Sequence, residues 1–102
     1  MATDEIESLL LGTWWRVSEE DAPGLVAYRK DGAQLPPSRA RRGFTLQKLG
    51  RASLIGTGAD DRQQKTDSHW HLDKQGRLFV EGSGDAVGAI AEIQGDRLLL
   101  RH

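Results

Sequence analysis

The stretch KTDSHWHLDKQGRLFVEGSGDAVGAIAEIQGDRLLLR (residues 65–101) consists of four short apolar runs separated by turn residues. The breaks fall at Gln75-Gly76, at Gly82-Ser83-Gly84-Asp85 and at Gln94-Gly95-Asp96. Glycine and aspartate tolerate the positive φ that tight hairpin turns demand. The stretch therefore predicts consecutive β-hairpins.

Alternating side chains within these runs support strands over helices. A period of two, with one apolar and one polar face, is typical of a half-buried antiparallel strand. In the run 65–72 one face carries Thr66, Ser68, Trp70 and Leu72, and the other carries Lys65, Asp67, His69 and His71. In the run 87–94 one face carries Val87, Ala89, Ala91 and Ile93.

Turn residues also divide the rest of the chain into short runs, with breaks at Asp31-Gly32, Leu49-Gly50 and Asp60-Asp61. Short strands at a spacing of about 8–12 residues are typical of an all-β sandwich or barrel. Tight turns favour pairing between consecutive strands, and closure removes exposed edges. We predict an eight-stranded antiparallel up-and-down (meander) barrel. Its strands are Trp14–Ser18, Leu25–Lys30, Arg42–Leu46, Ala52–Thr57, Lys65–Leu72, Arg77–Glu81, Val87–Gln94 and Arg97–Arg101.

One short helix is predicted at the start of the chain, over residues 3–11. Thr3 is a suitable N-cap, and acidic residues follow in the first turn, where the helix dipole favours them. Ile6, Leu9 and Leu10 recur at helical spacing, and Gly12 stops the helix. Two turns are too few for a stable isolated helix. We expect it to pack on the open end of the barrel.

A short helix running into Gly12-Thr13-Trp14, followed by eight strands, resembles the lipocalin-like (calycin) barrels. The resemblance implies a compact intracellular β-barrel of bacterial type, related to lipocalins and fatty-acid-binding proteins, over residues 1–102, with the barrel at 14–101. It also implies that a basic side chain late in the sequence covers Trp14 in a cation–π contact. Arg101, or failing that Arg97, is the expected residue. The chain is shorter than secreted lipocalins and lacks their disulfides.

Composition excludes several classes of function. The chain has 102 residues, which supports one domain, and no cysteine, which excludes disulfides, thiolate catalysis and Cys-containing metal sites. A net charge of -1 gives no overall attraction to nucleic acid. No apolar run approaches the roughly 20 residues of a membrane span, and the acidic first residues are unlike a signal peptide. We expect a cytoplasmic protein, monomer or homodimer, without a cofactor.

The barrel interior is the expected ligand site, because an eight-stranded barrel either fills with side chains or holds one small ligand. Tyr28, Phe44 and Trp70 are the predicted wall of such a pocket. Small residues such as Ala52 and Gly56 would leave space beside them. The sequence leaves open whether the interior is hollow or filled.

Three arginines, Arg39, Arg41 and Arg42, form the main polar candidate site. The net charge conceals a basic stretch, since residues 29–51 hold seven basic side chains and one acidic one. Guanidinium groups bind phosphates and carboxylates through paired hydrogen bonds. The three arginines could hold the polar head of a ligand, dock an acidic protein partner, or pair with the acidic N-terminal segment.

His69-Trp70-His71 is a further local candidate, because two histidines at i and i+2 share one strand face and could hold a metal or act as an acid–base pair. Trp70 is the better core residue, so alternation directs both histidines to solvent, and we predict no metal site. The glycines at 82–84 lack the residues of a phosphate-binding loop and fit a hairpin.

The favoured function is non-enzymatic binding of a small apolar or amphipathic ligand inside the barrel, with its head held by the 39–42 loop. The alternative is a protein-interaction or accessory module with a filled barrel. An enzyme of the calycin kind is a third class, for which the sequence identifies no catalytic residue.

Overall fold

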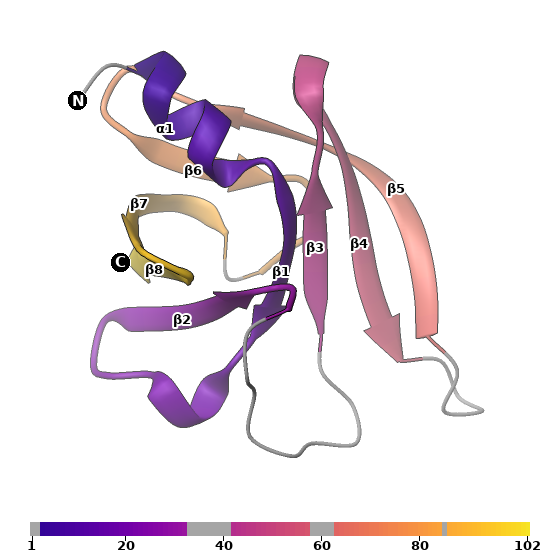
Figure 1. The fold of residues 1–102 in the computed structure, drawn as a ribbon, viewed down its shortest axis with the longest axis horizontal. Coiled ribbons are helices and arrows are strands. Elements are labelled where there is room, and N and C mark those ends of the chain that lie inside the picture. The colour runs from indigo at the N-terminus through magenta and orange to yellow at the C-terminus, as the bar shows by residue number, and fades with distance from the viewer. Residues whose placement is uncertain (1–2, 33–41, 58–62, 85) are drawn as a thin grey trace.

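A computed structural model describes residues 3–32, 42–57, 63–84 and 86–102 (Figure 1). Eight strands form one antiparallel sheet that closes into a barrel, with one short helix before it, as the sequence predicts. The elements are α1 (Thr3–Leu10), β1 (Gly12–Arg16), the 3₁₀ turn η1 (Ser18–Glu20), β2 (Leu25–Lys30), β3 (Gly43–Leu46), the 3₁₀ turn η2 (Lys48–Gly50), β4 (Arg51–Thr57), β5 (Gln63–Leu72), β6 (Arg77–Val80), β7 (Val87–Gln94) and β8 (Arg97–Arg101).

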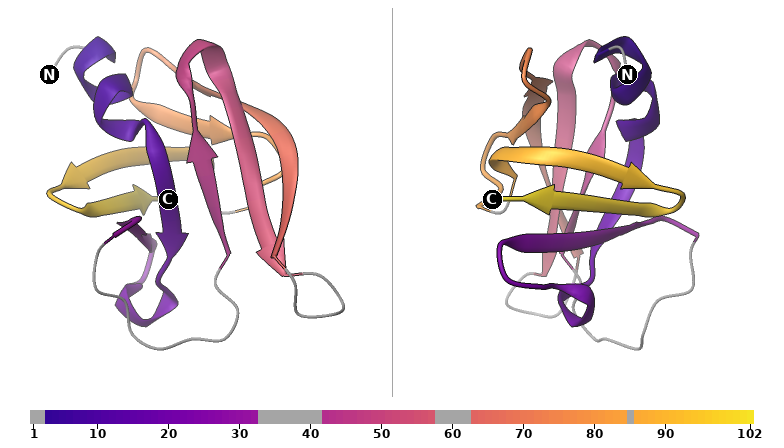
Figure 2. Two further views of the ribbon diagram at one scale, coloured as in Figure 1. Left: turned by 45° about the vertical axis from the view of Figure 1, so that its right-hand side comes forward. Right: turned by 90° about the vertical axis from the view of Figure 1, so that its left-hand side faces the viewer.

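The ring departs from strictly sequential order at one place. Consecutive strands pair from β3 to β8, but β1 lies between β2 and β3, and β2 pairs with β8 (Figure 2). Tyr28 of β2 is opposite Leu98 of β8. Both β2 and β3 run antiparallel to β1 and so parallel to each other, a relation that requires a crossover of about a dozen residues. The connection from Asp31 to Arg42 has that length.

Side chains fill the barrel interior. Every second residue along the strands points inward, and one continuous apolar cluster results. The rings of Tyr28 and Phe44 lie 4.8 Å apart between their centroids, tilted by 41°. Such aromatic contacts contribute beyond the area that they bury. The largest fully buried side chains are Trp14, Phe44, Leu10, Leu46, Leu78, Leu98, Leu100, Val17 and Val80.

The helix α1 is anchored to the barrel at its C-terminal end. The indole N–H of Trp14 donates a hydrogen bond of 2.9 Å to the carbonyl oxygen of Leu10, whose side chain is fully buried. The ammonium group of Lys30 donates to the carbonyl oxygen of Leu11 and lies 4.7 Å from the centroid of the Trp14 ring. The last carbonyls of a helix lack partners within the helix and carry partial negative charge. Trp14 and Lys30 satisfy two carbonyls at this end.

The expectation that Arg101 or Arg97 covers Trp14 is wrong. Lys30 occupies that position because it is the cross-strand neighbour of Trp14 in the β1–β2 pair. The expectation assumed that the last strand closes against the first, whereas β2 lies between them. Arg101 instead pairs with Glu92, and Arg97 pairs with Glu20.

Glycine at position 12 makes room for this arrangement. Gly12 has a φ of +119°, and a Cβ there would lie 2.6 Å from Nζ of Lys30. We expect Gly12→Ala to displace Lys30 from Trp14 and to lower the free energy of unfolding by about 2–3 kcal/mol. Gly32→Ala is the control, because Gly32 has a φ of +96° with no atom within 4 Å of its Cβ position, and its expected loss is about 1 kcal/mol. Urea denaturation measures both; equal losses would contradict the role of Lys30.

Candidate functional site

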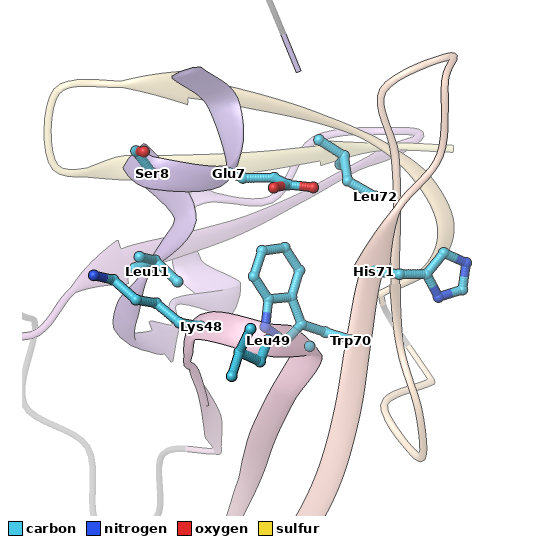
Figure 3. A pocket seen from close by; sticks show the side chains of 9 residues that line it. Glu7, Ser8, Leu11, Lys48, Leu49, Trp70, His71 and Leu72 are labelled. Atoms are coloured by element: carbon cyan, nitrogen blue, oxygen red, sulfur yellow. The ribbon is translucent and has the colours of Figure 1, made fainter. Parts of the chain in front are cut away.

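A hollow of about 490 Å³ lies at the barrel mouth that α1 covers (Figure 3). The helix forms one side, the hairpin tip η2 between β3 and β4 forms the other, and the end of β5 forms the floor. Its lining comprises Glu7, Ser8, Leu11, Lys48, Leu49, Gly50, Trp70, His71 and Leu72. We call this space the mouth hollow.

Trp70 presents an aromatic surface at the floor of the mouth hollow. Its side chain is 7% exposed, and its indole N–H donates a 2.7 Å hydrogen bond to the carbonyl oxygen of Gln47. The one polar atom of the ring is therefore already satisfied, and the small part of the residue that reaches the hollow is apolar in character. Leu11 and Leu72 extend this surface on the helix side and along β5 (Figure 3).

The two histidines beside Trp70 lie on the outer wall, where alternation predicts them. The His71 ring points away from the mouth hollow in Figure 3 and stacks on Phe79 with 4.7 Å between centroids. Nδ1 of His69 lies 3.6 Å from a carboxylate oxygen of Glu81, and both side chains are exposed. Within the described residues, no group of three or more potential metal ligands comes together.

Leu49 forms the lip of the mouth hollow and violates two local preferences. It is 94% exposed, although leucine is a typical core residue. Its φ is +65°, a left-handed conformation that costs a residue with a Cβ about 1 kcal/mol. The sequence marks a turn at Leu49-Gly50 but gives no sign that leucine takes a position suited to glycine or asparagine.

Opposite charges lie on the two sides of the mouth hollow, Glu7 on α1 and Lys48 on η2 (Figure 3). Neither side chain makes an ion pair or hydrogen bond to another residue in the described part of the chain. Both charges are available to the polar end of a bound molecule.

The residues predicted from the sequence as one ligand site are divided between the two ends of the barrel. A second hollow of about 150 Å³ lies near the start of β3 and is lined by Tyr28, Arg42 and Phe44. Trp70 instead lines the mouth hollow, which lies beyond the other end of β3. Tyr28 and Phe44 are themselves almost completely buried in the core. Arg39 and Arg41 lie outside the described residues.

The groups with shifted pKa values are engaged in arginine pairs away from the mouth hollow. A hydrogen bond from Arg29, with further attraction from Arg29 and Arg97, lowers the pKa of Glu20. Hydrogen bonding from Arg16 likewise lowers the pKa of Asp21. These pairs fasten η1 and the segment after it to β1, β2 and β8.

Comparison of the chain with protein-family models, with curated proteins and with solved structures found no match. Over the ranges that the structure describes, no helix has the length and apolar character needed to cross a membrane.

The Glu20 pairs imply a pH-dependent contribution to stability. Because folding lowers the pKa of Glu20, the ionised side chain stabilises the fold above its ordinary pKa of 4.5, and this contribution is lost as the pH falls through the lower folded value. We expect Glu20→Gln to cost about 1 kcal/mol at pH 7 and clearly less at pH 3. Urea denaturation at the two pH values measures this, with Glu7→Gln as control, because Glu7 makes no ion pair with another residue in the described part of the chain. A loss of equal size at both pH values would show that the charge of Glu20 is not what stabilises the fold.

Proposed function

We propose that this protein is a non-enzymatic binding module that takes a small apolar or amphipathic molecule into the mouth hollow. The observation that carries this proposal is the volume of about 490 Å³ above the buried Trp70 ring, beside a barrel interior filled with side chains. Small-molecule sites occupy about 300–1,000 Å³ and combine apolar walls with a few polar groups. The second hollow, at about 150 Å³, is below that range.

In this proposal the apolar part of the ligand packs on Trp70, Leu11 and Leu72, and its polar end lies at the rim beside Glu7 or Lys48. The sequence assigned the polar end to the 39–42 loop instead. Arg42 lines the second hollow, and the whole of β3 separates it from η2. The positions of these side chains therefore favour Lys48 and Glu7 over Arg42 as contacts for the polar end of the ligand.

The relation to lipocalin-like barrels stays an interpretation, supported by the Gly12-Thr13-Trp14 motif and the helix before it. The cation over Trp14 departs from it, because Lys30 comes from β2 and not from the end of the barrel sequence. Under this interpretation the ligand occupies the mouth and the interior is packed. The cytoplasmic location expected from the sequence also stays a prediction.

Protein interaction is the second candidate function, and one observation on the outer wall favours it. Phe79 lies between His71 and Val87 across β5, β6 and β7, and Val87 is 56% exposed. This row borders a mostly apolar depression of about 280 Å³. The acidic protein partner expected for the arginine loop stays a prediction, because Arg39 and Arg41 lie outside the described residues.

Filling the mouth hollow tests the proposal without removing a buried group. Ser8 is exposed on α1 and lines the hollow, so Ser8→Trp adds a large ring into that space. We expect wild type to bind anilinonaphthalene sulfonate, a flat amphipathic dye, at one saturable site. Fluorescence titration should show binding weakened by about tenfold or more in Ser8→Trp, with the melting temperature changed by less than about 3 °C.

Glu5→Trp is the matched control, because Glu5 is exposed on the same helix and does not line the hollow. It should bind the dye as wild type does. Wild-type affinity in Ser8→Trp would place the dye elsewhere and refute the proposed site.

A further inference from the structure

The hairpin tip η2 carries a side chain that the fold does not explain. Leu49 is 94% exposed, so it adds almost nothing to the core. It also adopts a φ of +65° and is followed by Gly50 at +74°. Two successive residues with positive φ are the local pattern for which glycine, asparagine and aspartate are suited.

Neither folding nor solubility favours leucine at this position. Asparagine would adopt the same backbone conformation at lower cost and would leave less apolar surface in water. Residues held in unfavourable conformations cluster at ligand sites, where the strain serves binding. The conformation and the exposure of Leu49 are independent observations, and both indicate a role outside the fold itself.

The position of Leu49 beside the mouth hollow indicates what this role is. Leu49 lines the mouth hollow on the side opposite α1, next to Lys48, and Trp70 lines the same hollow (Figure 3). A molecule resting on Trp70 and extending toward solvent would meet the Leu49 side chain at the rim. The apolar surface of Leu49 would then be removed from water, which it is not in the free protein.

We propose that Leu49 is a ligand-contacting residue, which covers the apolar part of a bound molecule and selects amphipathic ligands whose apolar part reaches from Trp70 to the rim. This inference rests on the proposed function. In this inference Leu49 contributes to the binding free energy although it lowers the stability of the free protein. Removal of the leucine should therefore weaken binding while leaving the fold as stable or more stable.

The variant Leu49→Asn tests both effects. With anilinonaphthalene sulfonate as the probe, we expect its dissociation constant to rise by about fivefold or more, because one apolar contact is lost. The melting temperature should stay the same or rise by a few degrees, up to about 5 °C. Leu49→Met, which keeps an apolar side chain of similar size, should retain binding within about twofold.

The control for general surface hydrophobicity is Leu9→Gln. Leu9 is 49% exposed on α1, does not line the mouth hollow, and glutamine preserves helix propensity. This variant should bind the dye as wild type does. Equal weakening in Leu9→Gln and Leu49→Asn would overturn the inference, because the dye would then be reporting exposed leucines in general.

Two further outcomes would overturn it. Unchanged dye binding in Leu49→Asn, with binding lost in Ser8→Trp, would leave the proposed function standing and remove Leu49 from the site. A melting temperature lowered by several degrees in Leu49→Asn would show that Leu49 stabilises the fold. Wild-type dye binding in Ser8→Trp is the separate result that refutes the proposed function itself.

Discussion

The attachment of α1 to Trp14 is the contact on which the arrangement of this protein depends. Trp14 is 1% exposed, its indole N–H holds the carbonyl oxygen of Leu10, and the Lys30 ammonium lies over its ring and holds the carbonyl oxygen of Leu11. An eight-residue helix is not stable by itself in water. These bonds, with the burial of Leu10, fix the helix over one end of the barrel. The backbone at Gly12 permits this because no Cβ occupies the space that Lys30 crosses.

That attachment also creates the candidate site. With the interior filled by aromatic and aliphatic side chains, space for a ligand arises where α1 faces the β3–β4 hairpin tip above Trp70. The two walls have different physical character. The helix side is anchored through buried groups, whereas the η2 side carries the exposed Leu49 in a left-handed conformation. An anchored wall with an exposed apolar side chain opposite is suited to binding, and the arginine-paired carboxylates lie elsewhere on the barrel.

Local signals in the sequence predicted the strands, the helix and the outward histidines. Turn glycines and a period of two are properties of neighbouring residues, so they can be recognised without knowledge of the whole fold. Pairing between distant strands carries no such signal. The sequence therefore missed the β2–β8 pair, assigned the cover of Trp14 to Arg101 in place of Lys30, and grouped Trp70 with Tyr28 and Phe44 although different ends of the barrel hold them. Leu49 was missed because its significance lies in its φ and exposure, which only the structure supplies.

The proposed ligand site is the mouth of the barrel covered by α1 and not the barrel interior. Intermolecular nuclear Overhauser effects between bound anilinonaphthalene sulfonate and the isotope-labelled protein test it most directly, because such effects arise only between protons that lie within a few ångströms. We expect contacts from the dye to the Trp70 ring and to the methyl groups of Leu11 and Leu72. Contacts to the rings of Tyr28 and Phe44 in their place would contradict the proposal and put the ligand in the barrel interior or at its opposite end.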